Sequence, residues 1–167
     1  GNSMDQVKWV GTIGADYGVI AVAGDSDVVT LGELLENLKT KPKKWVIGGG
    51  SAVGGWDHLK VLMAAKEYGI SNVRKIKYVS FDGGGDAVTQ LLAGNVQIFT
   101  GDVSEIKGFV DAGDIKIIAV LSPNRLPGDF SKFYTAKEQG VNVVGANWRG
   151  FYVPKGMSDD AYNFWAG

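Results

Sequence analysis

Extended apolar segments and amphipathic helical segments alternate along the chain, and this alternation limits the fold more than any other feature. Thr30 with Glu33 and Thr135 with Glu138 have the spacing of helix capping boxes. Extended segments are expected at residues 7–13, 17–23, 45–48, 75–80, 96–100, 115–121 and 143–153. Strands joined through helices imply βαβ crossovers, so we predict an α/β fold whose mainly parallel sheet has helices on both faces. The apolar segment 115–121 is expected near the centre of that sheet.

Glycine is about twice as frequent as in an average protein, with 25 of the 167 residues. Many of the glycines lie in three predicted strand-to-helix turns, at residues 48–55, 81–86 and 100–102. In open α/β sheets ligands bind beyond the carboxyl ends of the strands, and the N-termini of helices attract anions. Because glycine lets a backbone approach a ligand closely, the sequence predicts a backbone cradle for a carboxylate or a phosphate.

The net charge, the residue counts and the absence of known motifs exclude several classes of site. The net charge is −1 and no basic stripe is visible, so nucleic-acid binding is not indicated. The chain has no cysteine and a single histidine, His58, so neither a metal nor a cofactor is expected. No apolar run has the roughly 20 residues that a membrane span requires. The dinucleotide fingerprint fails at Val53 and the P-loop fails at Trp56.

Four side chains near these turns have two interpretations each. Ser51 either contacts a ligand or caps the following helix, and His58 either contacts a ligand or packs beside apolar neighbours on its helix. Asp102 either binds a ligand hydroxyl or ammonium group or caps a helix, whereas Asp86 is expected to cap its own helix. Ser51, Asp57 and His58 resemble a catalytic triad in composition only, because adjacent helical residues point in different directions.

Five segments together resemble the substrate-binding receptors of tripartite tricarboxylate transporters, often called Bug receptors. The similarity runs from about Val10 to Trp165, and no single motif decides it. The segments, in their order along the chain, are 48–58 (GGGSAVGGWDH), 78–86 (YVSFDGGGD), 113–127 (GDIKIIAVLSPNRLP), 135–140 (TAKEQG) and 147–156 (NWRGFYVPKG).

The resemblance implies a periplasmic, non-catalytic binding protein whose two α/β lobes close over a small carboxylate, in the manner of type II binding proteins. It also implies delivery of the ligand, a di- or tricarboxylate or an acidic amino acid, to membrane permease subunits. Family members recognise a carboxylate largely through backbone groups and ordered water. By position, the contacts implied for this chain are Gly50, Ser51, Ala52 and Gly54, with Gly83 and Gly84 nearby; His58 and Asp102 complete the candidate set.

The family's first lobe, with its own glycine-rich loop, has no counterpart in this sequence. We therefore expect residues 1–6 to be an N-terminal tail that begins with a cloning remnant, and residues 7–167 to form one α/β lobe. Two crossing strands, at about 18–23 and 148–153, are the expected hinge. An isolated lobe with an exposed cleft face is also expected to be able to pair with a second copy.

Two other functions remain open from the sequence. One is a cytoplasmic effector-sensing domain of a regulator, which can share this architecture and would have a DNA-binding segment elsewhere in its gene. The other is an enzyme that acts on a small phosphorylated or acyl substrate at the same anion site. The receptor hypothesis differs from both in predicting a signal peptide upstream.

Overall fold

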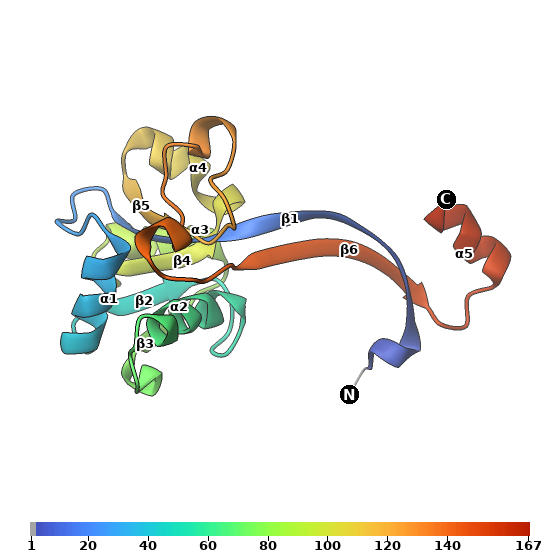
Figure 1. Cartoon of the computed structure of the whole chain (residues 1–167), viewed down its shortest axis with the longest axis horizontal. Coiled ribbons are helices and arrows are strands. Elements are labelled where there is room, and N and C mark those ends of the chain that lie inside the picture. Colours follow the sequence, from blue (N-terminus) through green and yellow to red (C-terminus); the bar gives the residue numbers. More distant parts are fainter. Residues whose placement is uncertain (1–2) are drawn as a thin grey trace. The chain divides into compact units, whose positions relative to one another are not determined.

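The structure is a computed structural model that describes residues 3–167, and it divides into two compact units (Figure 1). The larger unit comprises residues 17–146, and the smaller one combines the two ends of the chain, up to Asp16 and from Asn147 onward. The sequence predicts a single lobe over residues 7–167, whereas the structure divides this range between two units. The first two residues of the expected cloning remnant lie outside the described residues, and Met4–Gln6 form a short 3-10 helix.

The strands form a sheet in the order β3-β2-β4-β1-β5, and β6 pairs with β1. Strand β2 is parallel to β3 and β4, and β1 is antiparallel to β4 and β5. Four strands of this order therefore run one way and β1 runs against them, in agreement with the predicted α/β fold. The strands are β1 (Val7–Ala23), β2 (Val46–Gly49), β3 (Lys77–Ser80), β4 (Ile98–Asp102), β5 (Ile115–Val120) and β6 (Ala146–Pro154).

The expected central position of segment 115–121 is wrong, because β5 ends the strand order. The strand is nevertheless almost completely buried. Its outer edge meets a later part of the chain, where Val120 forms a parallel bridge with Thr135 and its carbonyl oxygen accepts the Ala136 N–H at 2.9 Å. An apolar run thus indicates burial, but it does not distinguish a central strand from a covered edge strand.

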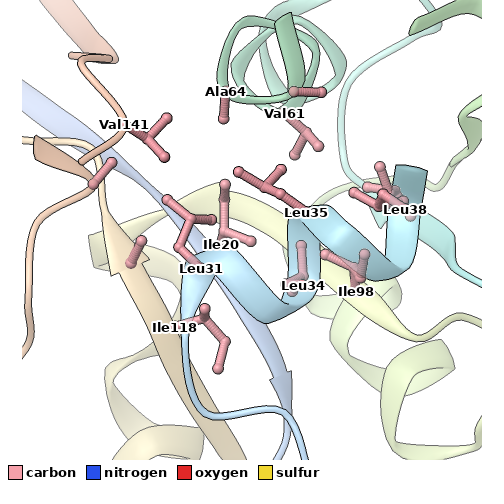
Figure 2. Packing of buried hydrophobic residues seen from close by; sticks show 14 of the residues in the cluster. Ile20, Leu31, Leu34, Leu35, Leu38, Val61, Ala64, Ile98, Ile118 and Val141 are labelled. Atoms are coloured by element: carbon pink, nitrogen blue, oxygen red, sulfur yellow. The ribbon is translucent and has the colours of Figure 1, made fainter. Parts of the chain in front are cut away.

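Helices cover both faces of the sheet in the larger unit. Alternate residues of β1 enter different cores: Ile20 and Val22 pack with α1 and α2, whereas Val19 and Ala21 pack with α3 and α4. Figure 2 shows the first core, in which the leucines of α1 lie among Ile20, Val61, Ala64 and Ile98. The helices are α1 (Leu31–Thr40), α2 (Trp56–Glu67), α3 (Gly84–Leu92), α4 (Val103–Ala112) and α5 (Asp159–Ala166).

Local signals in the sequence fix several element ends. The capping box predicted for Thr30 and Glu33 is present at the start of α1, and the Thr135–Glu138 box precedes a short 3-10 helix. The predicted break at residues 14–16 is wrong, since β1 continues without interruption. The last strand starts at Ala146 rather than at residue 143.

The smaller unit consists of the first half of β1, most of β6 and helix α5. The ring of Trp9 lies 5.6 Å edge-on from the rings of Trp148 and Tyr152. Helix α5 is attached to the strand by an ion pair of 2.9 Å between Lys8 and Asp159. Within residues 3–167, no helix combines the length and the apolar character that crossing a membrane requires.

Candidate functional site

The three glycine-containing turns meet at one edge of the sheet. Strands β2, β3 and β4 run parallel, so their carboxyl ends point to the same side. Each leads into a helix there: β2 into α2, β3 into α3, and β4 directly into α4 at Asp102. The predicted strand-to-helix turns and their common edge are therefore confirmed.

The first two turns pack directly against each other through glycine. A Cβ atom on Gly50 would lie 2.6 Å from the carbonyl carbon of Gly83 and 2.7 Å from the nitrogen of Gly84. A Cβ atom on Gly84 would lie 2.6 Å from Oε1 of Glu105. Gly83 has a φ of +101°, in the region that side chains rarely adopt. Glycine at this edge thus has two roles. It lets the turns pack closely against each other, and at Gly83 it allows a backbone with positive φ.

The turn before α2 is closed by reciprocal hydrogen bonds. The Ser51 N–H donates to Oδ2 of Asp57, and the Asp57 N–H donates to Oγ of Ser51, both at 2.9 Å. Gly55 occupies the N-cap position of α2, so the interpretation of Ser51 as the N-cap residue is wrong. Its hydroxyl nevertheless accepts a hydrogen bond from the first turn of the helix, which is what a cap does.

His58 lies on the outer side of the same turn. Its Nδ1 accepts the Gly54 N–H at 3.0 Å, and its ring stacks on Tyr78 with 4.6 Å between centroids. Burial lowers the pKa of the imidazole below its ordinary value. The ring borders a cavity of about 310 Å³ with Val53, Leu62, Val73, Arg74, Ile76 and Tyr78. In the described part of the chain, Ser51 and His58 form no hydrogen bond with each other, so the geometry of a triad is absent.

A buried lysine that the sequence analysis did not consider connects the turns. Lys60 of α2 is fully buried, and its Nζ lies 2.9 Å from Oδ1 of Asp57 and 2.8 Å from Oδ1 of Asp102. It also donates to the carbonyl oxygen of Gly101. The ammonium group thereby ties the start of α2 to the end of β4. Asp102 is the N-cap of α4, so its capping interpretation is confirmed, and its carboxylate is also part of this ion pair.

The sequence contains a signal for this cluster. Lys60 lies three residues after Asp57 and shares the face of α2 on which Val61, Ala64 and Ala65 are buried. A charged pair on the apolar stripe of a helix cannot be an ordinary solvent-exposed pair, because the stripe faces the core. The spacing alone would have suggested only a weak surface interaction.

Glu105 adds a third carboxylate beside this cluster. Its Oε2 accepts the Asp102 N–H at 2.8 Å, which completes the capping box of α4. Burial raises the pKa of Glu105, the Asp57 and Asp102 carboxylates raise it further, and Lys60 and the hydrogen bond from Asp102 oppose the shift. Because Lys60 pairs with two carboxylates and a third lies beside them, the inner side of this edge disfavours an additional anion.

The raised pKa of Glu105 gives a pH-dependent prediction. A carboxyl group whose pKa is higher in the folded state stabilises the protein in acid and loses that contribution as the pH rises through its folded pKa. Glu105→Gln removes the ionisation and keeps the capping box, since glutamine also serves at this position. We expect the variant to be more stable than the parent at about pH 8 and no more stable than it at about pH 4.

Urea unfolding of both proteins at both pH values measures this difference. A stability advantage of Glu105→Gln that is the same at both pH values would contradict the prediction, because the effect would then come from packing rather than from ionisation.

The N-terminus of α3 is the part of this edge with unused donors. Gly83, not Asp86, is the N-cap, so the expected capping role of Asp86 is wrong. Over residues 3–167 the N–H groups of Gly84, Gly85 and Asp86 form no hydrogen bond, and the exposed Gly85 has open space around the position of a Cβ. By contrast, the N–H groups of Ser51 and Gly54 have acceptors within the chain, and Ala52 and Gly54 lie exposed on the turn.

The candidate residues therefore do not form a single cluster. Gly50, Gly83 and Gly84 touch, while Ser51 reaches Asp102 through Asp57 and Lys60; His58 faces the separate cavity. No cluster of three or more histidine or acidic side chains suited to a metal ion occurs among the described residues.

A family model described as the tripartite tricarboxylate transporter family receptor matches residues 2–163, almost the entire chain. The chain belongs to this receptor family. Members of the tripartite tricarboxylate transporter receptor family are periplasmic solute-binding receptors, and the resemblance stated from the sequence is confirmed. A search of curated protein sequences finds no match.

Solved structures agree on the fold. A TctC solute-binding protein from Polaromonas without ligand is 26% identical with a TM-score of 0.77, over 99% of this chain and 55% of its own. A Rhodopseudomonas palustris protein with adipate (22% identity, TM-score 0.81) is matched over 96% of this chain and 52% of its own. MatC from the same organism with bound malate (16% identity, TM-score 0.80) is matched over 95% and 52%. This chain thus spans about half the length of these binding proteins.

Proposed function

We propose that this chain is the ligand-binding lobe of a periplasmic receptor that holds a small carboxylate and delivers it to the membrane subunits of a tripartite transporter. The family membership supports a solute-binding role rather than catalysis. Two neighbours of the same fold hold dicarboxylates, adipate and malate, which supports a ligand of this class. Opposed loops of a second lobe complete such a site, so the chain alone binds its ligand weakly.

The carboxylate binds at the N-terminus of α3. The observation that carries this proposal is the row of N–H groups of Gly84, Gly85 and Asp86 that have no acceptor in residues 3–167. These donors coincide with the positive end of the helix dipole. Glu105 lies on the inner side of Gly84, so the anion approaches from the exposed side, over Gly85. The neighbouring Gly50–Gly54 turn forms the wall of the site, and its Ala52 N–H is a further donor.

The test is the substitution Gly85→Asp. The new side chain meets open space, and an acidic residue in the first turn favours the helix, so the protein stays folded. The added carboxylate repels an anion at the same N–H groups, and we expect the affinity for adipate or malate to fall about tenfold, equivalent to about 1.4 kcal/mol. Calorimetric or NMR titration of the purified chain measures this affinity.

Gly32→Asp is the matched control. Gly32 occupies the same second position of helix α1 and also has open space, but α1 follows β1, which runs against β2, β3 and β4. Its first turn therefore belongs to the other end of the sheet. Equal affinities of the parent and of Gly85→Asp, or an equal loss in Gly32→Asp, would refute the α3 site.

We further propose that the two crossing strands β1 and β6 act as the hinge. The chain passes from one unit to the other at two places, after Asp16 and after Ala146. Both passages lie within a few residues of the expected segments 18–23 and 148–153, which supports this proposal. Residues 18–23 themselves pair with strands on both sides, so bending is more easily accommodated at the passages than within that segment. The expected pairing of two copies stays a prediction.

A further inference from the structure

Five lysines surround a hollow of about 800 Å³ at the amino-terminal ends of β2 and β3, which is the end of these strands away from the glycine turns. Val46 pairs with Lys77, so the segments before the two strands lie side by side. The lysines come from two segments, 41–44 and 75–77, that lie about thirty positions apart in the sequence. The lining residues are Thr40, Lys41, Pro42, Lys43, Lys44, Lys75 and Lys77.

The charges of these lysines are not neutralised within the chain. All five side chains belong to exposed residues, and over residues 3–167 none forms an ion pair, whereas Lys8, Lys39, Lys60 and Lys107 do. Five of the 17 basic residues thus lie around one hollow of a chain whose net charge is −1. Like charges at close range repel, and their summed field attracts an anionic partner.

The hollow continues into a second one. A neighbouring space of about 170 Å³ shares Pro42 and Lys75 with the first and adds Lys39 and residues 69–72 to its lining. Strand β3 is the last strand in the sheet order, so the hollow lies beside an open sheet edge. We call these two adjoining spaces together the lysine groove. Five ammonium groups from two segments of the chain suit an anionic chain better than a single small anion.

We propose that the lysine groove binds an extended acidic segment of a partner protein. Lysine ammonium groups are point charges on flexible stems, so they can follow carboxylates of irregular spacing, which a segment of Asp and Glu residues presents. Salt-screened attraction of this kind governs the rate of association and the orientation of the partner. Because the groove and the α3 site lie at opposite ends of the same strands, the groove does not depend on the proposed function, and either can fail without the other.

Two other polyanions fit the groove less well. Single-stranded nucleic acid binds through aromatic side chains on which bases stack, and the residues that line the larger hollow include none. An anionic membrane surface is flat and favours basic side chains beside exposed apolar ones that insert. This site is hollow; in the described chain Pro42 is the only apolar residue that lines its larger space, and the apolar residues Leu38, Ile70 and Ile76 of the smaller space are buried.

A fluorescein-labelled hexaglutamate peptide is the probe. We expect it to bind the intact chain at about 50 mM salt and to bind markedly more weakly at about 300 mM salt. Replacing Lys43, Lys44, Lys75 and Lys77 together by Gln should weaken binding at least about tenfold. The matched control replaces four exposed lysines elsewhere by Gln, and should change the affinity less than about twofold; these are Lys66, Lys132, Lys137 and Lys155.

Zero-length carbodiimide coupling, mapped by mass spectrometry, locates the peptide independently of affinity. Coupling concentrated at Lys43, Lys44, Lys75 and Lys77 supports the proposal. The proposal is overturned if the two quadruple variants weaken binding equally, or if coupling is spread over all surface lysines. It is also overturned if phosphatidylglycerol vesicles or a single-stranded oligonucleotide bind through these lysines more tightly than the peptide does.

Discussion

Lys60→Met is expected to lower the free energy of unfolding by about 3–5 kcal/mol, the largest effect of any single change proposed for this protein. The lysine is fully buried and its ammonium lies within 2.9 Å of one carboxylate oxygen each of Asp57 and Asp102. Methionine fills a similar volume, so the cost comes from two carboxylates left in the interior without a counter-charge, with Glu105 close by. Urea unfolding followed by circular dichroism measures the loss.

Two further variants separate this charge effect from general damage to α2. Lys66→Met changes an exposed lysine of the same helix and should alter the stability by no more than about 0.5 kcal/mol. The triple variant Asp57→Asn, Lys60→Met, Asp102→Asn removes all three charges but keeps oxygen acceptors for the Ser51 N–H and the α4 cap. It should be more stable than Lys60→Met alone. If Lys60→Met costs no more than Lys66→Met, the cluster does not stabilise the fold.

Gly50→Ala is expected to cost about 1–3 kcal/mol and also to weaken carboxylate binding. A Cβ atom at this position would meet the backbone of Gly83 and Gly84 at 2.6–2.7 Å, which is far inside van der Waals contact. The two turns must therefore separate, and the N–H groups at the start of α3 move with them. Parallel measurement of unfolding by urea and of adipate affinity by calorimetry tests both consequences.

Gly108→Ala is the control for this change. Gly108 lies inside α4 with open space around it, so alanine there should stabilise the protein by about 0.5–1 kcal/mol. The comparison with Gly85→Asp is equally informative, because that change is expected to weaken binding without a loss of stability. A Gly50→Ala protein as stable as the parent would show that the two turns are not in tight contact.

The sequence predicted the parts of the fold that depend on neighbouring residues. The capping box at Thr30, the strand-to-helix turns after β2 and β3, and the helical stripe of α1 all follow from spacings of a few positions. The same local patterns misplaced β5, whose apolar run reflects a covered edge, and predicted a break in β1 that does not exist. Strand order depends on pairings between distant segments, which periodicity does not encode.

The features of the candidate site likewise divide into those that the sequence predicts and those that it does not. The sequence by itself determined that glycine-rich turns would precede helices at one edge of the sheet, because the order of strand, glycine and helix is written in consecutive residues. Only the tertiary structure decided what the glycines contact, since Gly50 meets Gly83 and Gly84 meets Glu105 across turns far apart in the chain. It also decided that Lys60 is a buried ion-pair partner and that five lysines from two separate segments surround one hollow. Charge and close packing act through space, and a one-dimensional pattern contains distances along the chain only.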